Sequence, residues 1–135
     1  MPLMAEQARR LLIVEDEPDL LQQLKCCFED YKVYTAENRE DAITELRRYE
    51  PAVVLQDLGL PPKIEDLEGG LATLAEVLRL APHTKVIVLI DNVDQEIALS
   101  AVALGAYNFY KKPIDPDILR LIVNRAFAMG IKCRV

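Results

Sequence analysis

The sequence has 135 residues and a mass of 15.2 kDa, which is the size of one ordinary domain. Hydrophobic residues make up 51% of it and charged residues 28%, which excludes general disorder and provides enough apolar material for one core. Acidic residues outnumber basic ones by 22 to 16, so phosphate backbones repel the chain and we expect no direct nucleic-acid binding. No apolar run approaches the ~20 residues that span a bilayer. The three cysteines form no disulfide or zinc pattern, and we expect a cytoplasmic location without a membrane.

Five short apolar runs recur along the chain from the N-terminus. They lack polar alternation, which is typical of strands buried on both faces of a parallel sheet. In chain order the predicted strands are residues 11–14, 33–36, 52–56, 86–90 and 107–110.

Segments of helical period lie between and after these runs. In chain order the apolar residues that define them fall within 20–28, 42–49, 71–81, 97–104 and 119–127. Their ends carry recognisable signals. Pro18 lies in the first turn of the first helix, Asn38 is the predicted cap of the second, and Gly105 ends the fourth. Asp115 followed by Pro116 predicts the start of the fifth.

Strands that alternate with helices predict an α/β fold, in which a doubly wound parallel sheet lies between two layers of helices. In such sheets binding and chemistry gather beyond the carboxyl ends of the strands. The first strand is followed by Glu15-Asp16-Glu17, the third by Asp57, and the fifth by Lys111 and Lys112. If these strands are neighbours, their carboxylates and a lysine share one pocket.

Crowded carboxylates repel one another, and a hard divalent cation such as Mg²⁺ relieves this repulsion through oxygen ligands. A lysine supplies a point charge suited to a phosphoryl group. Asp57 beside both is a plausible nucleophile for phosphoryl transfer. Taken singly, each residue also has a structural interpretation. Asp57 could be a turn residue, Glu15-Asp16-Glu17 an acidic cluster at a helix N-terminus, and Lys112 a solvated lysine.

Three motifs together resemble the receiver domain of two-component response regulators. They are Leu-Ile-Val-Glu-Asp-Glu-Pro at 12–18, Gln-Asp-Leu-Gly-Leu-Pro at 56–61 and Gly-Ala-Tyr-Asn-Phe-Tyr-Lys-Lys-Pro at 105–113. The resemblance implies a flavodoxin-like, CheY-like sheet with strand order 2-1-3-4-5. It also implies a receiver domain over 11–129, an extension over 1–10, and a tail or linker start over 130–135.

The resemblance also assigns roles to individual residues. Asp57 is the implied phospho-acceptor, charged from a phosphohistidine on a sensor histidine kinase. Glu15, Asp16, Asp57 and the backbone carbonyl of Gly59 are the implied Mg²⁺ ligands. Lys112 is the lysine that contacts the phosphoryl group. The chain is therefore expected to be a signalling module and not a conventional enzyme.

One position departs from the family pattern. Receivers usually carry Thr or Ser at the end of the fourth strand, where the hydroxyl binds the phosphoryl oxygen and an aromatic residue follows its movement. Here Ile90 takes that place, Asp91 comes next, and Phe109 is the implied switch aromatic. A lost hydrogen bond to a charged acceptor is worth about 1.5–3 kcal/mol, enough to weaken the switch more than tenfold. The alternative is therefore a degenerate receiver that acts as an interaction module without phosphate.

The implied output surface comprises the fourth helix, the fifth strand and the fifth helix, through which receivers often form homodimers. The segment 62–68 is longer than usual in the family and acidic. Together with Leu-Gly-Leu-Pro-Pro at 58–62 and Leu-Ile-Val-Asn-Arg-Ala-Phe at 121–127, it resembles the sigma-54-type transcription factors linked to exopolysaccharide and exosortase systems. The expected output is accordingly control of transcription.

Two other classes fit the same alternation of strands and helices. Haloacid-dehalogenase-like hydrolases need a second Asp two residues after the nucleophile, where this chain has Gly59. A flavodoxin-like electron carrier needs a Ser-, Thr- or Gly-rich phosphate loop after the first strand. Glu15-Asp16-Glu17 stands there instead, which argues against that class.

Overall fold

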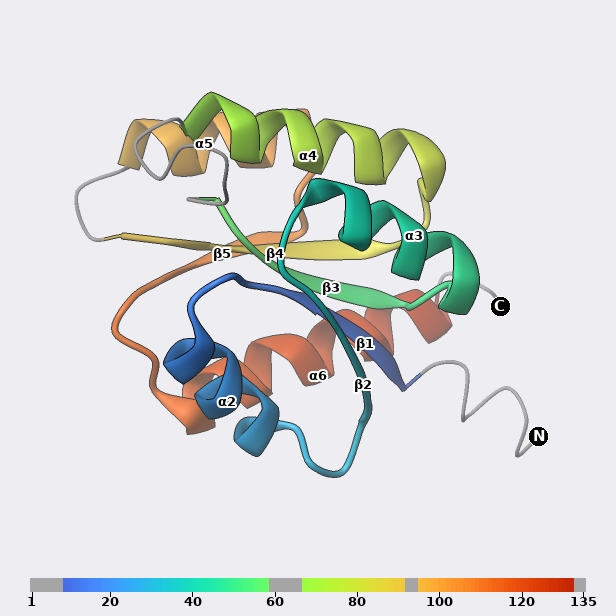
Figure 1. Ribbon diagram of the computed structural model, residues 1–135, viewed down its shortest axis with the longest axis vertical. Coiled ribbons are helices and arrows are strands. Elements are labelled where there is room, and N and C mark those ends of the chain that lie inside the picture. The colour runs from blue at the N-terminus through green and yellow to red at the C-terminus, as the bar shows by residue number, and fades with distance from the viewer. Residues whose placement is uncertain (1–8, 59–66, 92–94, 133–135) are drawn as a thin grey trace.

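A computed structural model describes residues 9–58, 67–91 and 95–132, and it shows the predicted alternation of strands and helices (Figure 1). The strands are β1 (Arg10–Val14), β2 (Lys32–Ala36), β3 (Val53–Asp57), β4 (Lys85–Ile90) and β5 (Asn108–Lys111). The helices are α2 (Pro18–Cys27), α3 (Arg39–Tyr49), α4 (Leu67–Leu80), α5 (Gln95–Leu104) and α6 (Pro116–Lys132).

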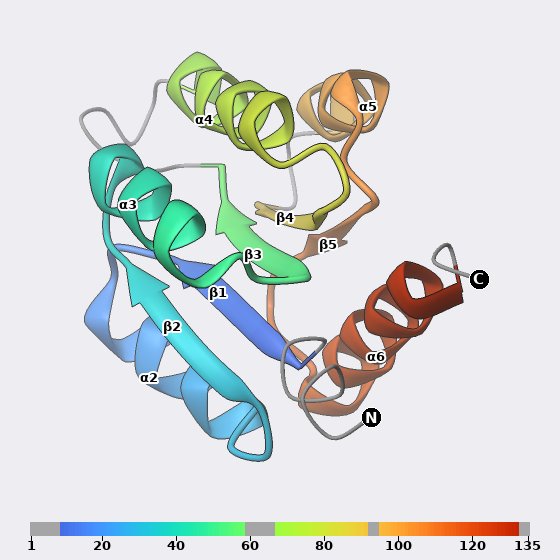
Figure 2. The same ribbon diagram turned by 90° about the vertical axis from the view of Figure 1, so that its right-hand side faces the viewer.

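All strand pairs are parallel and the sheet order is β2-β1-β3-β4-β5, which confirms the predicted fold class and strand order. Helices α3, α4 and α5 cover one face of the sheet, and α2 and α6 cover the other (Figure 2). This arrangement buries the three inner strands on both faces, which explains their continuous apolar runs.

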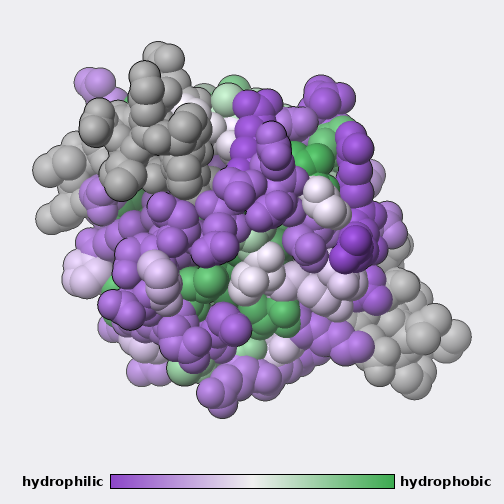
Figure 3. All heavy atoms as spheres, viewed as in Figure 1, coloured by the Kyte–Doolittle hydropathy of each residue, from purple (hydrophilic) through white to green (hydrophobic). Residues whose placement is uncertain are grey.

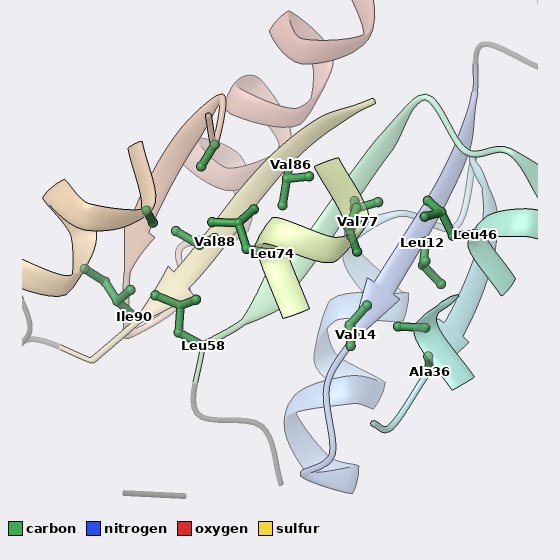
Figure 4. Close-up of a cluster of buried hydrophobic side chains, with 14 of the residues drawn as sticks. Leu12, Val14, Ala36, Leu46, Leu58, Leu74, Val77, Val86, Val88 and Ile90 are labelled. Carbon is green, nitrogen blue, oxygen red and sulfur yellow. The ribbon is translucent and has the colours of Figure 1, made fainter. Parts of the chain in front are cut away.

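Alternate strand residues build two separate cores, because successive side chains point to opposite faces of a sheet. On the α3–α4–α5 side, Leu12, Val86 and Val88 belong to one core with helix residues such as Leu74 (Figure 4). Their odd-numbered neighbours, such as Leu55, pack on the α2–α6 side. Burying one such aliphatic side chain stabilises a fold by roughly 1.5–3 kcal/mol, so these cores hold the strand ends in place.

The helix starts follow the signals in the sequence. Asn38 Oδ1 accepts a hydrogen bond from the Asp41 amide at 2.9 Å, which confirms the predicted cap of α3. Asp115 Oδ1 accepts from the amide of Asp117 at 3.0 Å, and Pro116 is the first residue of α6. Helix α6 continues to Lys132, so the boundary predicted after residue 129 falls inside this helix.

The surface seen in Figure 3 is mostly hydrophilic, with apolar side chains showing near its middle. Within the ranges that the structure describes, none of the helices combines the length and apolarity that a membrane span requires.

Helix α4 approaches the end of β3 unusually closely at Gly70. A Cβ atom placed on Gly70 would lie 2.0 Å from the Leu58 carbonyl oxygen and 2.8 Å from the Leu58 Cα. Both are backbone atoms, which cannot rotate out of the way. A Cβ on Gly69 would meet no atom of the described residues within 4 Å. Only glycine therefore fits at position 70, whereas position 69 has room for a side chain.

We predict opposite effects on stability for two neighbouring substitutions. Gly70→Ala should lower the free energy of unfolding by about 1–3 kcal/mol, because α4 must shift to relieve the clash. Gly69→Ala should raise it by roughly 0.5 kcal/mol, because alanine loses less backbone entropy in a helix. Urea unfolding of both variants is the measurement. Equal effects of the two substitutions would contradict the close approach of α4 to β3.

Candidate functional site

The residues after β1 and β5 are held in place by backbone hydrogen bonds that extend the sheet. The Glu15 amide donates to the Ala36 carbonyl at 2.9 Å, and the Lys112 amide donates to the Ile90 carbonyl at 2.9 Å. Asp57 is itself the last residue of β3. The carboxyl edge of the sheet thus carries acidic side chains from two neighbouring strands and a lysine from a third.

Three carboxylates converge at this edge. Glu15, Asp16 and Asp57 each offer an oxygen atom, and these atoms all lie within 4.8 Å of one another. Glu15 is 1% exposed and Asp57 is 7% exposed, whereas Asp16 is half-buried. Their mutual repulsion is therefore little screened by water.

Lys112 supplies the positive charge. Its Nζ lies 2.9 Å from Asp57 Oδ2, in a hydrogen-bonded ion pair that joins the ends of β3 and β5. Burial alone would lower the pKa of Lys112, but the hydrogen bond to Asp57 and the charges of Asp57, Glu15 and Asp91 raise it above its ordinary value. Lys112 is accordingly a fixed cation at the Asp57 carboxylate.

Ionisation of the Glu15 carboxyl is strongly disfavoured by its surroundings. Burial, followed by the hydrogen bond with Asp57 and the charge of Asp57, raises the pKa of Glu15 to about 8. When both carboxylates are ionised there is no proton between them, and the buried Glu15 Oε1 then has no hydrogen-bond donor among the described residues. A proton or a cation at this point is needed to satisfy the pair.

Glu17 has a different role from the two acidic residues before it. Its carboxylate accepts hydrogen bonds from the amides of Asp19 at 3.1 Å and Leu20 at 2.6 Å, so it caps α2. The acidic run therefore combines both interpretations drawn from the sequence. Glu15 and Asp16 face the cluster, and Glu17 stabilises the helix N-terminus.

The chemistry of the cluster fits a small hard cation. Mg²⁺ binds oxygen ligands at about 2.1 Å in octahedral geometry, so opposite ligands stand about 4 Å apart. The limit of 4.8 Å on the separations of the three carboxylate oxygens is compatible with this spacing. The predicted ligand Gly59 lies outside the described residues.

The two positions expected to form the switch lie on β4 and β5. Ile90 is 2% exposed and packs in the α3–α4–α5 core, and the partly buried Phe109 packs against the same core. Asp91 follows Ile90 at the surface. An aliphatic side chain therefore occupies the end of β4, next to the backbone that carries Lys112.

One polar residue at the site was not singled out from the sequence. Gln56 is completely buried immediately before Asp57, and its Nε2 donates to the Gly70 carbonyl at 2.8 Å. The available signal was a single amide side chain within the otherwise apolar run 52–56.

Comparison with known proteins gives a match over most of the chain. A family model described as the response regulator receiver domain matches residues 11–124. The nitrogen assimilation regulatory protein NtrX of Azorhizobium caulinodans is 32% identical over 121 residues, covering 88% of this chain and 26% of that protein. The alginate biosynthesis transcriptional regulatory protein AlgB of Pseudomonas syringae is 32% identical over 123 residues, covering 90% of this chain and 26% of that protein.

Solved structures give the same result. The receiver domain of NtrX from Brucella abortus superimposes with a TM-score of 0.78 at 29% identity, covering 87% of this chain and 98% of that one. The chain spans about a quarter of the length of the curated relatives named above.

The pKa of Glu15 predicts a pH-dependent stability in metal-free protein. The folded state keeps the Glu15 proton up to about pH 8, whereas the unfolded chain releases it near 4.5. The contribution of Glu15 to the free energy of unfolding is therefore complete below pH 4.5. It is lost as the pH rises to 8, by at most about 1.4 kcal/mol per pH unit.

Denaturant unfolding with a chelator present measures this effect. Glu15→Gln should flatten the decline between pH 5 and 8, because the amide cannot ionise. Glu40→Gln removes an exposed carboxylate from the first turn of α3 and should retain the wild-type slope. If the free energy of unfolding declines equally with pH in wild type and Glu15→Gln, Glu15 is not held protonated by its surroundings.

Proposed function

Because the chain belongs to the response regulator receiver domain family, we propose that Asp57 accepts a phosphoryl group from a sensor histidine kinase. The observation that carries this proposal is the pairing of Asp57 with Lys112 at 2.9 Å, beside two further carboxylates. The chain is then a signalling module and not a conventional enzyme.

Each neighbour of Asp57 has a task in this reaction. A carboxylate oxygen of Asp57 attacks the phosphorus of the kinase phosphohistidine, the phosphorus–nitrogen bond breaks, and the histidine nitrogen leaves with its electron pair. The product is an acyl phosphate on Asp57. Lys112 is placed to neutralise charge on the phosphoryl oxygens, because its Nζ already touches the attacking Asp57 carboxylate. The half-buried Asp16 leaves the cluster open to solvent on its side.

The acidic cluster is proposed to hold Mg²⁺. Glu15, Asp16 and Asp57 would bind it, together with the backbone carbonyl of Gly59. When bound, the ion neutralises the carboxylates and stabilises negative charge that develops on the phosphoryl group. Without it, the protein keeps a proton on Glu15, consistent with the raised pKa of this residue.

The proposed output surface consists of α5, β5 and α6. It carries exposed apolar side chains on both helices, among them Leu99, Val102, Ile118 and Leu121. A homodimer through this surface would bury them. Because the relatives are regulatory proteins about four times as long, we propose that the output is transcription, in the cytoplasm, without DNA contacts from this domain.

The relatives are consistent with the sigma-54-type subgroup that the sequence resembles. The name of AlgB refers to alginate biosynthesis, and alginate is an exopolysaccharide. A link to exopolysaccharide production is therefore part of the proposal.

A degenerate receiver is the second candidate. Ile90 is buried and has no hydroxyl group, so the end of β4 cannot donate a side-chain hydrogen bond to a phosphoryl oxygen at this position. In this alternative the domain keeps its fold and binds a partner without being phosphorylated.

Formation of an adduct separates the two candidates. With Mg²⁺ and beryllofluoride, fluorine NMR should show a bound signal for wild type and none for Asp57→Asn, which lacks the anionic acceptor. Asp19→Asn removes an exposed carboxylate from the first turn of α2 and should behave as wild type. Absence of a bound signal in wild type would favour the degenerate receiver.

A further inference from the structure

Gln56 occupies a position that should be apolar on packing grounds. It lies on β3 two residues after Val54, so its side chain points to the same face, toward the α3–α4–α5 core. Its exposed fraction is 0%. Burying an amide here is unfavourable unless both its donor and its acceptor find partners.

The amide makes one long-range contact. Gln56 Nε2 donates to the carbonyl of Gly70 at 2.8 Å, which links β3 to a residue 14 positions later in α4. Gln56 Oε1 is buried and has no hydrogen-bond partner within the part of the chain that the structure describes. Among the described residues the side chain is thus only half satisfied, and its bond to Gly70 joins the residue before Asp57 to the first turns of α4.

A second contact makes this connection rigid. The Gly70 Cα faces the backbone of Leu58, so closely that no Cβ atom fits between them. Residues 56 and 58 flank Asp57, and both therefore touch the same residue of α4. A displacement of Asp57 along or across β3 must be transmitted to Gly70, because there is no free space to absorb it.

Stability does not explain why glutamine is present. The Gly70 carbonyl lies within α4, where the helix already offers it a backbone donor. A leucine at position 56 would remove the unpaired Oε1 without stranding any backbone group, and such replacements are often neutral or stabilising. A half-satisfied buried amide is therefore better explained by a role in positioning.

We propose that Gln56 is a positioning residue that ties α4 to the acceptor strand, so that α4 responds to what binds at Asp57. This inference rests on the proposed function, since it concerns the consequence of occupancy at the same site. It assigns a signalling role to α4, which packs on the same side of the sheet as Ile90. Ile90 is buried and has no hydroxyl group that could bind a phosphoryl oxygen.

Amide hydrogen exchange tests this connection. In wild type, Mg²⁺ with beryllofluoride should change the protection of the amides of residues 71–74 by about fivefold or more, the lower end of typical coupling between sites. In Gln56→Leu the adduct should still form by fluorine NMR, but this change in α4 should be lost. Gln56→Met provides a second apolar variant of similar length.

Thr73→Val is the matched control. Thr73 is buried in the same part of α4, and its Oγ1 donates a hydrogen bond within the helix, to the Gly69 carbonyl at 3.0 Å. This variant should keep the wild-type response. Gln56→Leu should also melt at the same temperature as wild type or higher. A larger loss of melting temperature in Gln56→Leu than in Thr73→Val would identify the amide as merely structural and overturn the proposal.

The other outcomes separate this proposal from the proposed function. A retained response of α4 in both Gln56 variants would overturn the positioning role, even if the adduct forms. If no adduct forms in wild type, amide hydrogen exchange in α4 is compared between wild type and the Gln56 variants with Mg²⁺ alone, and this comparison tests the connection. A response of α4 that depends on Gln56 would then support the connection while contradicting phosphoryl transfer, and no response would overturn both.

Discussion

The pairing of Asp57 with Lys112 is the interaction on which the proposed function depends. The two residues come from β3 and from the end of β5, strands that are separated in the sheet by β4. Their contact is possible because the carboxyl ends of parallel strands lie on one edge, where side chains can reach across a neighbour. The same edge brings Glu15 and Asp16 from the end of β1 to the other side of Asp57. One cation then faces three carboxylates, and this excess of negative charge is what a metal ion would relieve.

Burial around this site has two opposite effects on the protein. Apolar packing on both faces holds the strand ends rigidly, and the charged cluster gains its strength from being little exposed to water. The same burial makes the cluster unfavourable when it is empty, as the raised pKa of Glu15 indicates. Gln56 is a second example, because its buried amide oxygen on the α3–α4–α5 side has no partner among the described residues. Both features are unfavourable in the resting protein, and the proposed functions of the two sites account for them.

Much of this arrangement could be predicted from the sequence, because strands, caps and strand ends leave local signals. The uniform apolar runs predicted the inner strands, Asn38 and Asp115 predicted helix starts, and the residues after the strands predicted the cluster. The separate task of Glu17 could not be predicted, since three consecutive acidic residues look alike until the chain turns into α2. The bond between Gln56 and Gly70 was equally hidden, because it depends on how closely α4 packs against β3.

Calorimetric titration with Mg²⁺ tests the central claim most directly, which is that these carboxylates form a single cation site. Wild type should bind one equivalent, and Asp16→Asn and Asp57→Asn should each weaken the affinity by about tenfold or more, because each removes an anionic ligand from the same ion. Asp19→Asn, whose carboxylate is exposed on α2, should bind as wild type does. Undiminished affinity in both Asp16→Asn and Asp57→Asn would contradict the account.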